Sequence, residues 1–268
     1  MAPSEAPRAD PRPRGEGEPR VLVEVEGGIG TLTLNRPDKR NALDRRMIGE
    51  LKAALTRCDL SADVRVVVLR ATGKDFCAGL DLGELLASAD LSPEENERRA
   101  MELGELFVQL RAMPKVSVAV VAGRALAGGC GLATACDLVV ASAAAQFGYP
   151  EIQRGFVPAM VMTMLRRSVG EKVAFDLAAT GRLVSAEEAE RMGLISRVVS
   201  PDQLDVRVAT LLAQLASSSP SALALIKSQL HQVEELGFDA GVALGARVNS
   251  VARATPEFRR SIESFLQK

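Results

Sequence analysis

The sequence predicts an α/β fold in which buried strands alternate with helices, followed by a helical C-terminal region. Val64 to Leu69 and Val116 to Val121 are short, continuous apolar runs, typical of strands buried on both faces of a sheet. Strand, turn and helix patterns recur roughly every fifty residues without visible sequence identity, which indicates one α/β architecture rather than separate domains. From Pro201 onward the strand pattern stops and helical patterns continue to the end.

The first elements follow from local patterns. Val21 to Asn35 predicts two strands around Gly27-Gly28-Ile29-Gly30, because apolar residues alternate on both sides of that turn. Asn41 is the expected cap of a helix whose apolar residues recur every fourth position, from Leu43 to Leu55. Residues 88–99 are polar and are predicted to be mobile. The sequence therefore predicts a hairpin and a helix before the first buried strand.

The rest of the chain adds helices and one more strand. Residues 101–113 read as an amphipathic helix, and 138–141 as a further buried strand. Helical patterns then cover 204–215, 221–236 and 256–266. We expect three regions: a disordered N-terminal extension (1–20), an α/β core (21–200) and a helical region (201–268).

Composition excludes several classes of protein. The 268 residues are 47% hydrophobic and 25% charged with a net charge of −1, which gives no electrostatic footprint for nucleic acid or an anionic membrane. A single His rules out a His-rich metal site, so no metal is expected. The four cysteines form no C-x-x-C pair and are typical of free thiols in a reducing compartment. No apolar run reaches membrane-spanning length and residues 1–20 lack a signal-like core, so a cytoplasmic location is expected.

The most informative feature is a glycine-rich turn followed by a lone carboxylate. An apolar strand runs into Ala127-Gly128-Gly129-Cys130-Gly131, a short small-residue helix follows, and Glu151 comes twenty residues after Gly131. Such a turn directs free backbone N–H groups toward one point, where a negative oxygen can sit. An oxyanion site and one carboxylate together can move protons beside a carbonyl group.

The motifs resemble those of the crotonase, or enoyl-CoA hydratase/isomerase, superfamily. The resemblance rests on the following segments in order: Asn35-Arg36-Pro37 with Asn41-Ala42-Leu43, Phe76 to Leu82, Ala127 to Leu132 with Cys136-Asp137-Leu138, Phe147 to Ile152, and Thr180-Gly181-Arg182. It extends from about Val21 to the C-terminus. Each motif alone is weak evidence, but their order and spacing together make coincidence a poor explanation.

The resemblance implies a spiral of ββα turns with a C-terminal trimerisation region, assembled as a homotrimer or a dimer of trimers. It also implies acyl-CoA thioester substrates and no cofactor beyond the CoA that they carry. Carried over by position, the backbone N–H groups of Leu80 and Gly128 form the oxyanion hole and Glu151 transfers protons. The expected substrate-binding residues are Lys39, Arg40 and Ala42 in the CoA-holding loop, Ala78 and Leu82 beside the adenine, and Gly131. Tyr149, the single Tyr of the sequence, is a further candidate to line the substrate pocket, with core packing as the equal alternative.

One departure from the family pattern bears on the mechanism. Hydratases of this family use two glutamates, and the position of the first is Gly131 in this sequence, which cannot titrate. A single carboxylate is the pattern of the family's double-bond isomerases, which shuttle a proton between carbons. Hydration remains open, because one Glu could donate the C2 proton while backbone groups hold the water. The sequence favours an enoyl-CoA hydratase, with a 3-enoyl-CoA isomerase or a catalytically silent scaffold as the alternatives.

Other polar residues have simpler explanations. Asp137 is expected to make a structural cap or salt bridge, and Asp81 to stabilise a helix end. Lys227 and Lys268 are candidate contacts for a CoA phosphate, although a solvated helix face is the favoured interpretation for both. A nucleophilic role for Cys130 is disfavoured because no base lies near it in the sequence.

Overall fold

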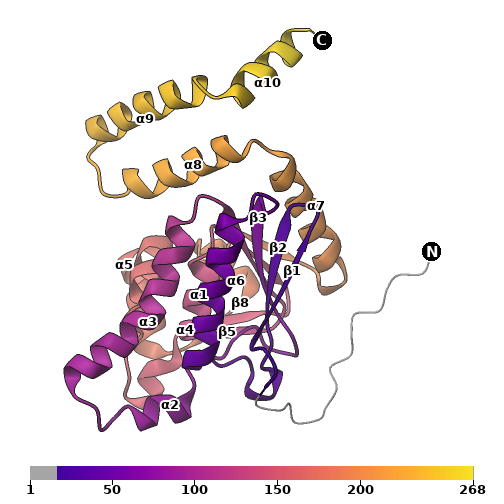
Figure 1. Cartoon of the computed structure of the whole chain (residues 1–268). Coiled ribbons are helices and arrows are strands. Elements are labelled where there is room, and N and C mark those ends of the chain that lie inside the picture. The colour runs from indigo at the N-terminus through magenta and orange to yellow at the C-terminus, as the bar shows by residue number, and fades with distance from the viewer. Residues whose placement is uncertain (1–16, 268) are drawn as a thin grey trace.

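The computed structural model describes residues 17–267 and centres on a six-stranded sheet in the order β1-β2-β3-β4-β6-β9 (Figure 1). Only the β1/β2 hairpin is antiparallel, and each later pairing is parallel. The strands are β1 (Val21–Glu26), β2 (Ile29–Leu34), β3 (Val66–Ala71), β4 (Val116–Val121), β6 (Leu138–Ser142) and β9 (Arg197–Val199). The predicted hairpin and the three predicted buried strands are all present, with ends shifted by one or two residues.

A second, three-stranded sheet carries the two segments that immediately precede the glycine turn and the turn with Glu151. Its order is β5-β7-β8, formed by β5 (Arg124–Leu126), β7 (Gln146–Gly148) and β8 (Leu183–Ser185). β5 and β7 run parallel, so the Gly128 turn after β5 and the Pro150 turn after β7 emerge at the same edge. This small sheet, which the sequence patterns did not predict, brings the two halves of the candidate site together.

Helices cover both faces of the large sheet because its strand residues alternate in direction. Val67 and Leu69 belong to the larger core, beneath α1 (Arg45–Leu60) and α3 (Pro93–Ala112). Val66 and Val68 face a smaller core closed by α7 (Leu204–Ser217). The remaining helical elements are α2 (Leu82–Ala87), α4 (Gly128–Thr134), α5 (Met162–Thr180), α6 (Ala186–Arg191), α8 (Pro220–Val233), α9 (Phe238–Arg253), α10 (Pro256–Leu266), η1 (Pro37–Lys39), η2 (Pro150–Arg154) and η3 (Pro201–Gln203).

Two helix starts differ from expectation. α1 is capped by Asp44, whose side chain accepts a hydrogen bond from the Met47 N–H at 2.8 Å. Asn41 instead donates to two loop carbonyls and accepts from the Arg36 N–H, with a left-handed φ of 54°. α3 begins at Pro93 behind a Ser92 cap, so much of the predicted mobile segment is helical. The first turns of α3 are polar and show no apolar repeat, so the helix was not predicted there. A serine cap followed by proline is nevertheless a common helix start.

In the helical C-terminal region α8 still lies against the compact body, and α9 and α10 lie beyond it (Figure 1). α8 and α9 lie side by side, and α10 continues beyond them. Several large apolar side chains on this region are exposed, among them Phe238, Phe258, Ile262 and Phe265. Across residues 17–267 no single helix could cross a membrane by length and hydropathy; Pro201–Ser217 and Pro220–Val233 pass that test only as a pair, bent by 102°.

The N-terminal extension is described only in its last residues, since 1–16 lie outside the described part of the chain. Residues 18–20 contact the core through backbone groups. The Arg20 N–H donates to Glu50 at 2.7 Å, and the Pro19 carbonyl accepts from the Asn35 amide at 3.1 Å. The ordered domain therefore begins before Val21.

Candidate active site

Eight of the ten predicted site residues line one groove of about 600 Å³. It runs from the loop before α1 to the turn after β7, and the residues that it brings together are Lys39, Arg40, Ala42, Ala78, Leu80, Leu82, Gly128 and Glu151. Positions separated by more than one hundred residues in sequence thus meet around one cavity of a size typical for small ligands.

The backbone amides of Leu80 and Gly128 meet because glycine allows their segments to approach closely. Gly79 has a φ of 98°, and a Cβ built there would lie 2.8 Å from the Ala127 Cβ and 3.4 Å from the Gly128 nitrogen. Gly128 opens α4, so its N–H has no intrahelical partner. Within residues 17–267, neither the Leu80 nor the Gly128 N–H donates one of the turn and loop hydrogen bonds. Two unpaired donors therefore line the groove, as an oxyanion site requires.

Ala127, immediately before Gly128, has a strained backbone. Its φ of 52° and ψ of −128° lie in a region that residues with a Cβ rarely adopt. Two hydrogen bonds hold it there: its N–H donates to Gly148 O at 2.8 Å, and its carbonyl accepts from the Gly131 N–H at 3.0 Å. This backbone conformation at Ala127 sets the direction of the first turn of α4, and hence the direction in which the Gly128 N–H points.

We expect Ala127→Gly to stabilise the protein by about 1 kcal/mol, because strain of this kind costs ~1–3 kcal/mol and glycine removes it at an entropic cost. Thermal unfolding should show a rise in Tm of about 2–4 °C. Ala133→Gly, inside α4, is the matched control and should lower Tm instead. A lower Tm for Ala127→Gly would show that the backbone at this position is not strained.

Glu151 approaches the groove from η2, directly after β7. Its carboxylate is largely buried, and Oε2 has no hydrogen-bond partner among the described residues. Burial raises the pKa of this carboxyl above its usual range, partly offset by its own backbone N–H and the charge of Arg154. A raised pKa makes the ionised carboxylate a stronger base, which suits a side chain that takes a proton and returns it. Arg154 also lines the groove, and sequence reasoning missed it, although it lies on the same short helix as Glu151.

Buried ion pairs fix the loop that carries Lys39, Arg40 and Ala42. Arg36 donates to Asp81 at 2.7 Å and to the Ala42 carbonyl at 3.0 Å. Burial works against ionisation of Asp81, but the Arg36 contact and the first amides of α2 hold its pKa below the usual range. Asp81 thus caps α2 and anchors the loop, and its predicted role at a helix end is confirmed.

The structure differs from the prediction for the two remaining site residues, because neither Gly131 nor Tyr149 lines the groove or the other two cavities described within residues 17–267. Tyr149 is completely buried. A Cβ on Gly131 would lie 2.2 Å from Cγ1 of Val161 and 3.2 Å from Cζ of Phe107. The space that a side chain at Gly131 would need is therefore filled by Val161, a residue that sequence reasoning did not single out.

We therefore expect Gly131→Glu to destabilise the protein rather than add a second carboxylate. Overpacking of this kind costs ~1–3 kcal/mol, and burying a charge adds to that. Thermal unfolding should show a marked loss of Tm, partly recovered in Gly131→Glu combined with Val161→Gly. An unchanged Tm for Gly131→Glu alone would mean that the Val161 side chain moves aside at little energetic cost.

The other polar candidates are structural. Lys227 is buried on α8, and its ammonium donates to Asp137 at 2.8 Å and to two backbone carbonyls, so it holds α8 against the core and does not reach the groove. Asp137 makes the predicted salt bridge. Lys268 lies outside the described residues. Burial raises the pKa of the Cys77 and Cys130 thiols to about 12, which keeps both protonated. Within residues 17–267 no cluster of three His, Cys, Asp or Glu side chains is placed to hold a metal ion.

Comparisons with known proteins agree with this geometry. A family model described as enoyl-CoA hydratase/isomerase matches residues 24–268. The chain belongs to the enoyl-CoA hydratase/isomerase family.

Relatives and solved structures of this family match nearly the whole chain. A Thermus thermophilus protein named "Putative enoyl-CoA hydratase" is 41% identical, covering 92% of this chain and 98% of the relative. The 2,3-dehydroadipyl-CoA hydratase of Escherichia coli is 37% identical, with coverage of 92% and 96%. The crystal structure of an enoyl-CoA hydratase from Mycobacterium smegmatis superposes with a TM-score of 0.89 at 33% identity, covering 93% of this chain and 97% of the other. These matches support the crotonase fold and an enzyme of enoyl-CoA hydratase type.

Proposed function

We propose that the protein adds water across the 2,3 double bond of an enoyl-CoA thioester, with Glu151 as its only proton-transferring side chain. The observation that carries this proposal is the meeting of Glu151 with the unpaired Leu80 and Gly128 amides in one groove. In the proposed pose, the thioester oxygen accepts hydrogen bonds from both amides. Lys39, Arg40 and Arg154 provide positive charge along the same groove for the CoA phosphates.

One carboxylate is sufficient for a balanced reaction. Ionised Glu151 takes a proton from water as the water oxygen bonds to C3, and the π electrons move toward the thioester oxygen. The two amides stabilise the resulting enolate, with ~2.7–4 kcal/mol for one donor in comparable sites. Glu151 then returns the proton to C2, so H and OH have been added and the carboxylate is restored. Water and the thioester are the only reactants in this scheme.

The filled space at Gly131 favours a second candidate, isomerisation of a 3-enoyl-CoA. With Val161 where a second carboxylate would stand, Glu151 could take a proton from C2 and deliver it to C4 across the same enolate. Both reactions use the same oxyanion site and the same base. They differ in the position of the double bond in the substrate and in whether water is admitted to C3.

Parallel incubations test the proposal. The protein is mixed with 2-enoyl-CoA and 3-enoyl-CoA esters, including crotonyl-CoA and 3-methylglutaconyl-CoA, and the products are separated chromatographically. We expect 3-hydroxyacyl-CoA from the 2-enoyl esters. Conversion of 3-enoyl to 2-enoyl ester without hydroxyacyl product would favour isomerisation, and no turnover of any ester would favour a silent scaffold.

We also propose that the C-terminal region joins copies of the chain into a trimer or a dimer of trimers. Phe258 and Ile262 are 42% and 43% exposed in the single chain, and Phe265 is 74% exposed on the same helix, α10. Such contiguous apolar exposure is unfavourable in water unless it is covered.

Light scattering at micromolar concentration should therefore give a mass of three or six chains. Phe258→Glu combined with Phe265→Glu should reduce that mass, whereas Val25→Glu, on an exposed position of β1, should not. A mass of one chain for the unmutated protein would contradict the assembly.

A further inference from the structure

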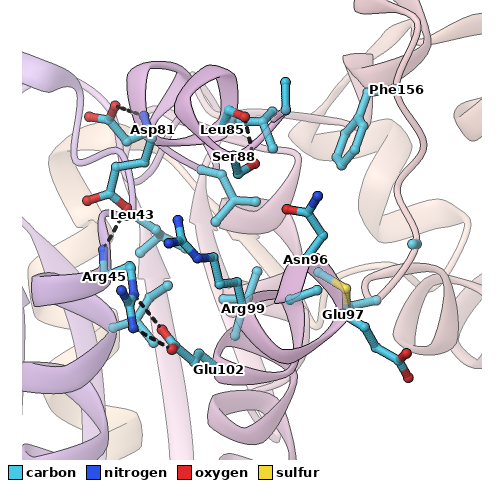
Figure 2. A pocket seen from close by; sticks show the side chains of 18 of the residues that line it. Leu43, Arg45, Asp81, Leu85, Ser88, Asn96, Glu97, Arg99, Glu102 and Phe156 are labelled. Carbon is cyan, nitrogen blue, oxygen red and sulfur yellow. Dashed lines mark hydrogen bonds and ion pairs between the residues drawn. The ribbon is translucent and has the colours of Figure 1, made fainter. Parts of the chain in front are cut away.

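A second cavity, of about 530 Å³, lies beside the catalytic groove, and Figure 2 shows the side chains that line it. The cavity and the groove share Leu80, Asp81, Leu85, Ala89 and Phe156 in their walls, so a ligand held at the oxyanion amides can extend toward this chamber. Most of the surface that the chamber wall exposes is apolar, and it comes from α1, α2, α3 and the segment after η2. Its volume lies within the ~300–1,000 Å³ typical of sites for whole small ligands, which is more space than a short acyl chain needs.

Two arginines line this chamber, and their surroundings differ. The Arg45 guanidinium makes two hydrogen bonds to Glu102, at 3.0 and 2.7 Å, so its charge is already paired. The Arg99 side chain extends among the lining side chains in Figure 2. Its only ion pair within residues 17–267 is a 3.7 Å contact between Nε and Glu95, and that buried Nε makes no hydrogen bond.

The acidic residues around the chamber are occupied or turned away. Glu84 accepts from the Arg45 backbone N–H, and Asp81 pairs with Arg36. Glu102 is held by Arg45, although the charge of Arg99 also contributes to lowering its pKa. Glu97 points away from the other lining side chains in Figure 2. Arg99 is thus the one lining cation in the described chain that lacks a hydrogen-bonded anion.

Resting on the proposed function, we propose that this chamber selects acyl-CoA esters whose far end carries a carboxylate, that is, monothioesters of dicarboxylic acids. The aliphatic wall accommodates the methylene chain, and Arg99 binds the terminal carboxylate. A guanidinium pairs with a carboxylate through charge-assisted, often bidentate hydrogen bonds, stronger than those between neutral groups. Asn96, which lies under Phe156 in the same view, offers a further amide donor.

Binding of saturated esters, which cannot be hydrated, tests this without relying on turnover. Calorimetry would compare adipyl-CoA with hexanoyl-CoA and suberyl-CoA with octanoyl-CoA. Two chain lengths are used so that a terminal carboxylate too short to reach Arg99 does not decide the result. We expect the carboxylated ester of at least one pair to bind on the order of 10-fold to 100-fold more tightly. Arg99→Met should remove that preference and leave the neutral ester unaffected, while Arg99→Lys should keep part of it.

Arg98→Met is the matched control, because Arg98 pairs with Glu95 at 2.8 Å but does not line the chamber. It should retain the preference. Equal or tighter binding of the neutral ester in both pairs, or equal losses for both kinds of ester in Arg99→Met, would overturn the inference. Turnover of the matching 2-enoyl esters separates the two proposals: a binding preference without hydration contradicts the proposed function alone, and hydration without a preference contradicts the chamber's selectivity alone.

Discussion

Glu151→Gln is expected to lower kcat on any enoyl-CoA substrate by ~10²–10⁴-fold while leaving binding of the CoA ester intact, because it removes the group that carries the proton and little volume. Initial rates at saturating ester, with calorimetric binding of a saturated ester, would measure both effects. The scheme has no second carboxylate to take over, since the space at Gly131 is filled by Val161.

Stability provides the check that this variant is folded. Burial raises the pKa of Glu151 in the folded protein, so the fold binds this proton more tightly than the unfolded chain does. Its stabilising contribution is therefore present at low pH and lost as pH rises through the folded-state pKa. Glu151→Gln should equal or exceed the unmutated protein in Tm above that pKa, whereas Glu24→Gln, an exposed change on β1, should alter neither Tm nor rate. Full activity of a folded Glu151→Gln would refute its role.

Gly128→Val is expected to lose at least ~10²-fold in turnover, about the cost of one oxyanion donor. The structure refines the reason. A Cβ at Gly128 would meet nothing closer than 3.5 Å, at Leu103 Cδ2, so the backbone turn itself tolerates a side chain. The γ-methyl groups of valine would extend toward the space that the thioester must enter, and the amide would no longer reach its oxygen.

Gly128→Ala is the matched control, since it adds only the tolerated Cβ. We expect it to keep the fold and lose much less activity than Gly128→Val. Gly129→Ala should behave differently, because its Cβ would lie 2.4 Å from the Cys77 carbonyl oxygen and would disrupt the turn. Near-normal turnover in folded Gly128→Val would remove this amide from the oxyanion site.

The parts of the fold that sequence patterns predicted are those whose signal is local. Val66 to Leu69 and Val118 to Val121 are apolar on both faces, so the burial of these strands follows from the residues themselves. The start of α3 was missed because polar residues fill its first turns and only Ser92 and Pro93 mark its beginning. β5, β7 and β8 span three residues each, too short for a periodic pattern.

In the candidate site, too, the residues that could be predicted are those with a local sequence signal. Glu151, Leu80 and Gly128 could be placed because motifs carry them at fixed spacing. Tyr149 could not be placed, because it lies between β7 and η2, where no periodic pattern shows whether a side chain faces the groove or the core. The filling of the space at Gly131 by Val161, and the place of Arg99 in the second chamber without a hydrogen-bonded anion, depend on how segments remote in sequence pack together.

Hydration of a 2-enoyl-CoA in deuterated water tests the central claim most directly. We expect 3-hydroxyacyl-CoA to accumulate with one deuterium at C2, and Glu151→Gln to slow both product formation and deuterium incorporation by the same factor. The contrary result would be that the protein forms no 3-hydroxyacyl-CoA but converts a 3-enoyl ester labelled at C2 to its 2-enoyl isomer, with that label retained at C4. Glu151 would then serve as an isomerase base, and the proposal of hydration would be wrong.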